Sequence, residues 1–141
     1  MMDQRALERL AAGVARAMGP GSRLYLTGDL GTGKSVFARA VLRELGVEGA
    51  IPSPSFIVDA VYESRGLEIH HIDLYRLKGS AEELEFYGID DVLDSRAAVI
   101  VEWADRLKGL RLRDGVKVHL DFTPDPGKRV VSIDGRIMAG D

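Results

Sequence analysis

The 141-residue sequence contains no cysteine. This absence excludes disulfide bonds, thiolate nucleophiles and cysteine-based zinc sites, and it fits a reducing compartment. No apolar run approaches the roughly 18 residues of a membrane-spanning helix, and the N-terminus shows no signal-peptide hydrophobic region. We therefore expect a cytoplasmic protein with no membrane partner.

The sequence also lacks an excess of positive charge. It has 19 Lys and Arg against 22 Asp and Glu, which gives a formal net charge of −3. A nucleic-acid backbone attracts broad basic surfaces, so we expect no DNA partner and no direct binding of tRNA. The length and a hydrophobic content of 45% suit a single domain over residues 1–141.

What the sequence does contain is a phosphate-binding loop at residues 28–35, GDLGTGKS, which matches G-x-x-x-x-G-K-[ST] at every fixed position. In such a loop, backbone N–H groups point at phosphate oxygens, the lysine reaches the outer phosphates and the final hydroxyl binds Mg²⁺. The lysine here is Lys34 and the hydroxyl is that of Ser35. The other members of the loop are Gly28, Asp29, Leu30, Gly31, Thr32 and Gly33.

The residues around this loop have the order that the motif requires. Residues 23–27 alternate like a strand, and apolar residues recur at helical spacing over 36–45. An amphipathic helix is predicted earlier, over residues 4–18.

Two acidic residues stand at predicted strand ends. Strands are expected over 56–62 and 67–75, joined by a hairpin turn, and the second carries Asp73 near its end. Asp73 is either a solvated carboxylate or a group that positions Mg²⁺ or water. Residues 97–101 form a continuous apolar run, typical of a buried central strand, and Glu102 follows it as the acid of a Walker B site does.

Other features leave alternatives open. Ser53 and Ser55 flank Pro54, in either a plain turn or a mobile loop that senses the outer phosphate. Trp103 is either core or a lid near the nucleotide. His70 and His71 are adjacent, so they face opposite sides of a strand and do not jointly bind a metal.

The remaining elements complete the predicted fold. Ser80 opens a capping box and a short helix that ends near Gly88. The strands 116–122 and 129–133 form a final antiparallel hairpin. We expect an α/β, three-layer P-loop NTPase-like domain with a mixed, mostly parallel sheet and this C-terminal antiparallel hairpin.

The order of the motifs GDLGTGKS, SPSF, HIDLYRL, EELEFYGIDD and VIVEW resembles the bacterial TsaE family, formerly YjeE. These are small ATPases required to make threonylcarbamoyladenosine in tRNA. The resemblance runs from about residue 24 to 103. It implies ATP and Mg²⁺ as cofactors, a TsaD–TsaB pair as protein partners, and tRNA reached only through that complex.

The resemblance also implies roles for individual residues. It makes Lys34, Asp73 and Glu102 the catalytic residues, and places Mg²⁺ on Ser35 and Glu102. Nucleotide contacts come from the loop residues above and from a second set that matches the family by position. This second set is Ser55, where the family often has threonine, together with Trp103, Gln4 and Arg129.

We therefore expect slow, Mg-dependent ATP hydrolysis, because no arginine finger is evident in the chain and a partner would have to complete the site. A small-molecule P-loop kinase is the first alternative, although only about forty residues remain after Glu102 for a lid. A GTPase would need an N-K-x-D segment, which is missing. A non-catalytic, nucleotide-dependent assembly module is the third.

Overall fold

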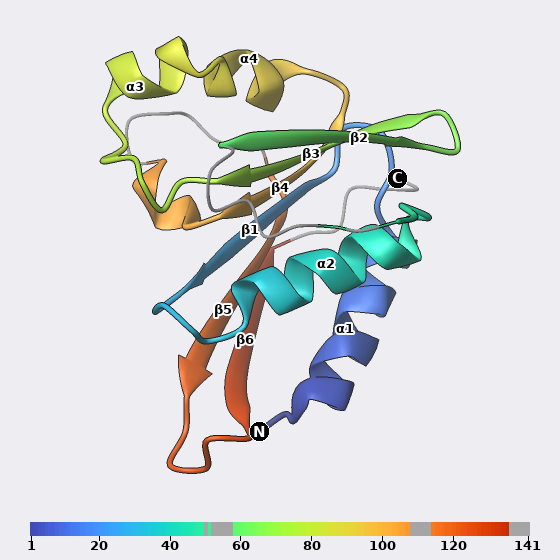
Figure 1. Ribbon diagram of the computed structural model, residues 1–141, viewed down its shortest axis with the longest axis vertical. Helices are drawn as coiled ribbons and strands as arrows, with labels where there is room; N and C mark the ends of the chain where they lie inside the picture. The colour runs from blue at the N-terminus through green and yellow to red at the C-terminus, as the bar shows by residue number, and fades with distance from the viewer. Residues whose placement is uncertain (50, 52–57, 108–113, 136–141) are drawn as a thin grey trace.

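The protein is described from a computed structural model, which defines residues 1–49, 51, 58–107 and 114–135. Helices and strands are interspersed along the chain (Figure 1). In chain order they are α1 Gln4–Arg16, β1 Arg23–Gly28, α2 Lys34–Glu44, β2 Asp59–Ser64, β3 Leu67–Asp73, α3 Ala81–Phe86, α4 Ile89–Asp94, β4 Ala98–Glu102, the 3-10 turn η1 Ala104–Arg106, β5 Val116–Phe122 and β6 Arg129–Gly135.

The strands form one six-stranded sheet in the order β2-β3-β4-β1-β5-β6. The four inner strands run parallel to one another, and β2 and β6 pair antiparallel at the two edges. This confirms the mixed, mostly parallel sheet and the final hairpin. Parallel neighbours need crossover connections, and α3 and α4 supply the one between β3 and β4.

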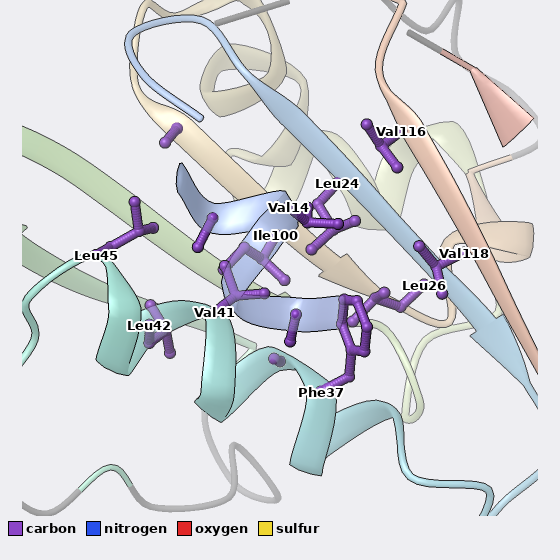
Figure 2. Close-up of a cluster of buried hydrophobic side chains, with 14 of the residues drawn as sticks. Val14, Leu24, Leu26, Phe37, Val41, Leu42, Leu45, Ile100, Val116 and Val118 are labelled. Atoms are coloured by element: carbon purple, nitrogen blue, oxygen red, sulfur yellow. The ribbon is translucent and has the colours of Figure 1, made fainter. Parts of the chain in front are cut away.

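Helices cover the sheet on both faces, which makes the three layers that the sequence predicts (Figure 1). Helices α1 and α2 lie on one face, where Phe37, Val41 and Leu42 of α2 share one core with Leu24 and Leu26 of β1 (Figure 2). Helices α3 and α4 lie on the other face. Their buried residues, Leu84, Ile89 and Leu93, join a second core with Val99 and Val101 of β4.

Strand β4 contributes to both cores, because its successive side chains alternate between the two faces. All five of its residues are buried, as expected for a central strand under helices on both sides. Burial extends through Glu102, which the sequence places after the strand and the structure places at its last position.

Several element ends differ from the sequence predictions. Helix α1 ends at Arg16 instead of residue 18, because the N–H of Met18 turns back to the carbonyl of Ala15. Strand β2 begins at Asp59, and residues 56 and 57 of the predicted strand lie outside the described part of the chain. The predicted helix from Ser80 is confirmed with its capping box, and a second short helix follows after Gly88 at φ +70°. None of the described helices is long and apolar enough to span a membrane.

Candidate functional site

The carboxyl ends of three neighbouring strands converge on the phosphate loop. The loop leaves β1 and enters α2, while β3 and β4 end beside it. In the sheet register Glu102 is opposite Leu26 of β1 on one side and Asp73 of β3 on the other. The structure therefore brings together the loop and the two acids that the sequence singles out. Ligands of open α/β sheets bind at such carboxyl ends.

Glycine is required at the start of the loop. Gly28 has φ +140°, and a Cβ there would lie 2.5 Å from the carbonyl oxygen of Leu120 and 2.8 Å from Oγ1 of Thr32. Gly31 and Gly33 also have positive φ, at +83° and +109°. These conformations are open to glycine at little cost, so the sequence pattern allows the tight curl that the structure shows.

The N-terminus of α2 opens onto this curl. Its N-cap is Gly33, and within the described chain no side chain caps it. The first N–H groups of a helix have no intrahelical partners, and the helix dipole favours negative charge there. A phosphate group is the ligand that fits such an end.

Lys34 is held at the base of the loop. Its Nζ donates to the carbonyls of Gly28 at 2.6 Å and Asp29 at 2.8 Å, and only 5% of the residue is exposed. Burial lowers the pKa of the Lys34 amine, while nearby carboxylates, with Glu102 first among them, act in the opposite direction. The ammonium group also lies 4.2 Å from the ring centroid of Trp103.

Ser35 and Glu102 form the second part of the site. The Ser35 hydroxyl donates to Oε1 of Glu102 at 2.8 Å, and the glutamate is only 2% exposed. Hydroxyl and carboxylate oxygens are hard donors of the kind that Mg²⁺ prefers, and Mg²⁺ usually takes one or two carboxylates plus substrate phosphates. The donor set next to the loop therefore fits Mg²⁺.

Asp73 lies across the sheet from Glu102 and differs from it. Its Oδ1 accepts from the backbone N–H of Tyr75 at 3.0 Å. Burial raises the pKa of the Asp73 carboxyl, the Tyr75 hydrogen bond opposes this, and the negative charge of Glu102 raises it further. A carboxylate with a raised pKa beside a phosphate loop can accept a proton or orient water.

Trp103 follows directly after Glu102 in the left-handed region, at φ +58°. A non-glycine residue there carries strain of about 1–3 kcal/mol, which concentrates at functional sites. The indole ring lies between the Lys34 ammonium and the ring of Tyr75, 5.2 Å away, and it also packs against the second core. The packing supports the core interpretation of Trp103, and the lid near a nucleotide stays a prediction.

Arg106 is a residue of this region that the sequence analysis missed. Its guanidinium lies 5.0 Å from the Trp103 ring centroid, and Nη1 donates to the carbonyls of Leu74 at 3.1 Å and Leu77 at 2.8 Å, and to that of Tyr75. It ties the segment after β3 to the segment after β4. The only signal was its place shortly after the strand that ends at Glu102.

The described residues that were assigned by family position lie at different distances from the loop. Arg129 reaches the loop, because its Nε donates to the carbonyl of Thr32 at 3.0 Å and its guanidinium covers the Phe122 ring at 4.9 Å. Gln4 instead donates to Glu8 on its own helix, at 3.0 Å. Ser55 lies outside the described residues.

His71 was also missed as a site residue, although it was noted in the sequence. It is fully buried, and its Nε2 lies 2.5 Å from Oε2 of Glu102. The alternation of β3 places His71 and Asp73 on one face. The sequence contains that signal. It does not reveal the strand order that places β3 beside β4.

Comparisons with known proteins identify relatives over most of the chain. Residues 1–131 match the model of a family described as threonylcarbamoyl adenosine biosynthesis protein TsaE. The tRNA threonylcarbamoyladenosine biosynthesis protein TsaE of Haemophilus influenzae is 36% identical over 72% of this chain and 64% of its own length. The proteins of that name from Rickettsia felis and Bacillus subtilis are each 33% identical, over 93% and 72% of this chain and 75% and 61% of their own lengths.

A solved structure supports the fold independently. The crystal structure of Bacillus subtilis YdiB superposes with a TM-score of 0.71 and covers 94% of this chain and 81% of that one. At 22% sequence identity this likeness shows the shared fold. The chain spans less than two thirds of the length of the Haemophilus relative.

Proposed function

Since this chain belongs to the TsaE family, we propose that it binds Mg-ATP and hydrolyses it slowly in support of N6-threonylcarbamoyladenosine formation in tRNA. The observation that carries the proposal is the pairing of Ser35 with Glu102, at 2.8 Å, beside a phosphate loop that holds Lys34. This is the combination of phosphate cradle, cation and oxygen ligands that phosphoryl transfer uses. We also propose a cytoplasmic location, in line with the absence of cysteine.

The loop residues have different roles in binding Mg-ATP. The N–H groups between Gly28 and Ser35 bind phosphate oxygens, and Lys34 exchanges its carbonyl partners for the outer phosphates. Ser35 and Glu102 hold Mg²⁺, which neutralises charge on the phosphates when it is bound. Arg129 braces the loop from outside through the carbonyl of Thr32.

We assign the attacking water to Asp73. Both oxygens of Glu102 already have partners, in Ser35 and His71, whereas Asp73 has a backbone contact at Oδ1. Its raised pKa brings the carboxyl closer to the range in which it can exchange a proton with water. Phosphoryl transfer to water needs positioning and charge stabilisation, and a second acid can supply the positioning.

Two arginines near the loop, in the part of the chain that the structure describes, support slow turnover by the chain alone. Arg106 is tied to backbone carbonyls, and Arg129 donates to the loop and to its own hairpin. Neither is placed as a free cation for the transferring phosphoryl group, and such an arginine contributes a factor of about 10³–10⁵. We propose that a TsaD–TsaB pair completes the site, and that tRNA is reached only through this complex.

The test is phosphate release from Mg-ATP by the purified chain, alone and with a purified TsaD–TsaB pair. We expect slow release that the pair increases, and no release by Lys34→Ala. Asp73→Asn should bind Mg-ATP as the wild type does but lose turnover by about 10²-fold or more.

Three outcomes would count against the proposal. Phosphate transfer to a small-molecule acceptor, with little release to water, would make the chain a kinase. ATP-dependent complex formation with equal turnover in wild type and Lys34→Ala would make it a non-catalytic assembly module. No effect of the pair on turnover or complex formation would remove the proposed partners.

A further inference from the structure

His71 is the most completely buried ionisable residue near the site. It has 0% exposure, and its side chain points from β3 toward Glu102 at the end of the neighbouring β4. The two side chains meet at 2.5 Å between Nε2 and Oε2. Glu102 thus has its two oxygens on two different partners, Ser35 and His71.

The direction of this hydrogen bond follows from the chemistry of the two groups. Ionised carboxylate oxygens only accept, so the hydrogen lies on Nε2 of His71. Nδ1 of His71 is buried and finds no hydrogen-bond partner among the described residues. A hydrogen on Nδ1 would be a buried donor without an acceptor there, which favours the tautomer with the hydrogen on Nε2.

The contact has a consequence for the orientation of Glu102. A glutamate side chain at the end of a strand has three rotatable bonds, and holding one arrangement costs conformational entropy. Anchoring Oε2 on a rigid, fully packed imidazole fixes the carboxylate plane and turns Oε1 toward Ser35. Groups that orient a metal-binding residue in this way raise metal affinity without touching the metal.

We infer that His71 is a positioning residue of the proposed Mg-ATP site: its Nε2–H holds Glu102 in the orientation that receives Mg²⁺ together with Ser35. The inference rests on the proposed function. The inference adds His71, which neither the loop motif nor the acid Glu102 identifies, to the site. His71 acts only by orienting Glu102.

The test compares two substitutions at this position. His71→Leu removes the donor at similar size, and His71→Gln keeps an N–H at about the place of Nε2. ATP binding is measured by calorimetry with EDTA and then at increasing Mg²⁺. His71→Leu should raise the Mg²⁺ concentration for half-maximal binding by about 10–100-fold, and His71→Gln should restore most of it. Binding in EDTA should be the same in all three proteins.

The adjacent histidine provides a matched control. His70 is 8% exposed and faces Asp59 and Glu68 on the opposite side of the strand. His70→Gln should leave the Mg²⁺ requirement unchanged. In a Glu102→Gln background, His71→Leu should add no further loss, because the role of His71 acts through Glu102.

The outcomes separate this inference from the proposed function. If wild-type protein shows no Mg²⁺-dependent ATP binding, the proposed function fails. If wild type binds but His71→Leu keeps the normal Mg²⁺ requirement, or loses binding equally in EDTA, His71 is only a packing residue. A ¹⁵N spectrum of the nucleotide-free protein tests the hydrogen bond itself: the inference requires Nε2–H, and a ring protonated only on Nδ1 would overturn it.

Discussion

At the scale of single residues, Gly28 links the sequence pattern to the shape of the loop. Its φ is +140°, and a Cβ at this position would lie only 2.5 Å from the carbonyl oxygen of Leu120. The backbone therefore leaves no room for a side chain. Gly28→Ala should lower the free energy of unfolding by about 2–4 kcal/mol, because it combines backbone strain with a backbone clash. Urea denaturation measures this loss.

Gly21 is the control for this prediction. It also has positive φ, at +80°, but a Cβ there would meet nothing within 4 Å. Gly21→Ala should therefore cost only the strain of the backbone, about 1 kcal/mol. Equal losses for the two variants would show that the close approach at Gly28 has no energetic weight.

The sequence predicted many of the site residues. It could not predict which side chains contact one another. The loop, Asp73 and Glu102 follow from motif and strand ends, and the structure places them together. The contact of His71 with Glu102 depends on the register between β3 and β4, which a single sequence does not encode locally. Arg106 was missed for a similar reason, since its partners lie some thirty residues away in the chain.

At the scale of elements, the β2–β3 hairpin carries a pH-sensitive contact. His70 lies between Asp59 at 2.7 Å and Glu68 at 3.0 Å. Burial works against the charged ring, but the hydrogen bonds with these carboxylates outweigh it and raise the pKa of His70. Because the folded pKa exceeds the unfolded value, the contact stabilises the fold fully below about pH 6.5 and loses this contribution as pH rises through the folded pKa.

The measurement is the difference in unfolding free energy between wild type and His70→Gln over a range of pH. The difference should be largest on the acidic side and should shrink above about pH 6.5. Taking the difference removes the titration of the other histidines. A difference that stays constant with pH, or grows as pH rises, would contradict the assignment.

Most elements could be predicted because local signals coincide with tertiary ones. Ser80 and Glu83 form the predicted capping box, and the apolar run before Glu102 is the buried central strand. Predicted ends were less accurate, because they depend on turns. Arg65 and Gly66, both at positive φ, form a two-residue hairpin turn that lets β2 extend to Ser64.

At the scale of the whole molecule, the sheet order explains why the site lies where it does. Strand β1 sits between β4 and β5, so the loop that follows it lies beside the end of β4 and near the edge hairpin that carries Arg129. The predicted strands and helices around the phosphate loop indicated three layers, and the structure has them. The order of the strands could not be predicted, because several right-handed connections satisfy the same sequence of elements.

The most direct test of the account is calorimetric titration of the chain alone with ATP, with and without Mg²⁺, in wild type and Lys34→Ala. Wild type should bind ATP, more tightly with Mg²⁺, and gain about 2.7 kcal/mol of stability at a ligand concentration of about 100 times Kd. Lys34→Ala should lose this binding, because the outer phosphates lose their cation. No Mg²⁺-dependent binding by wild type, or equal binding by Lys34→Ala, would contradict an Mg-ATP site in this loop.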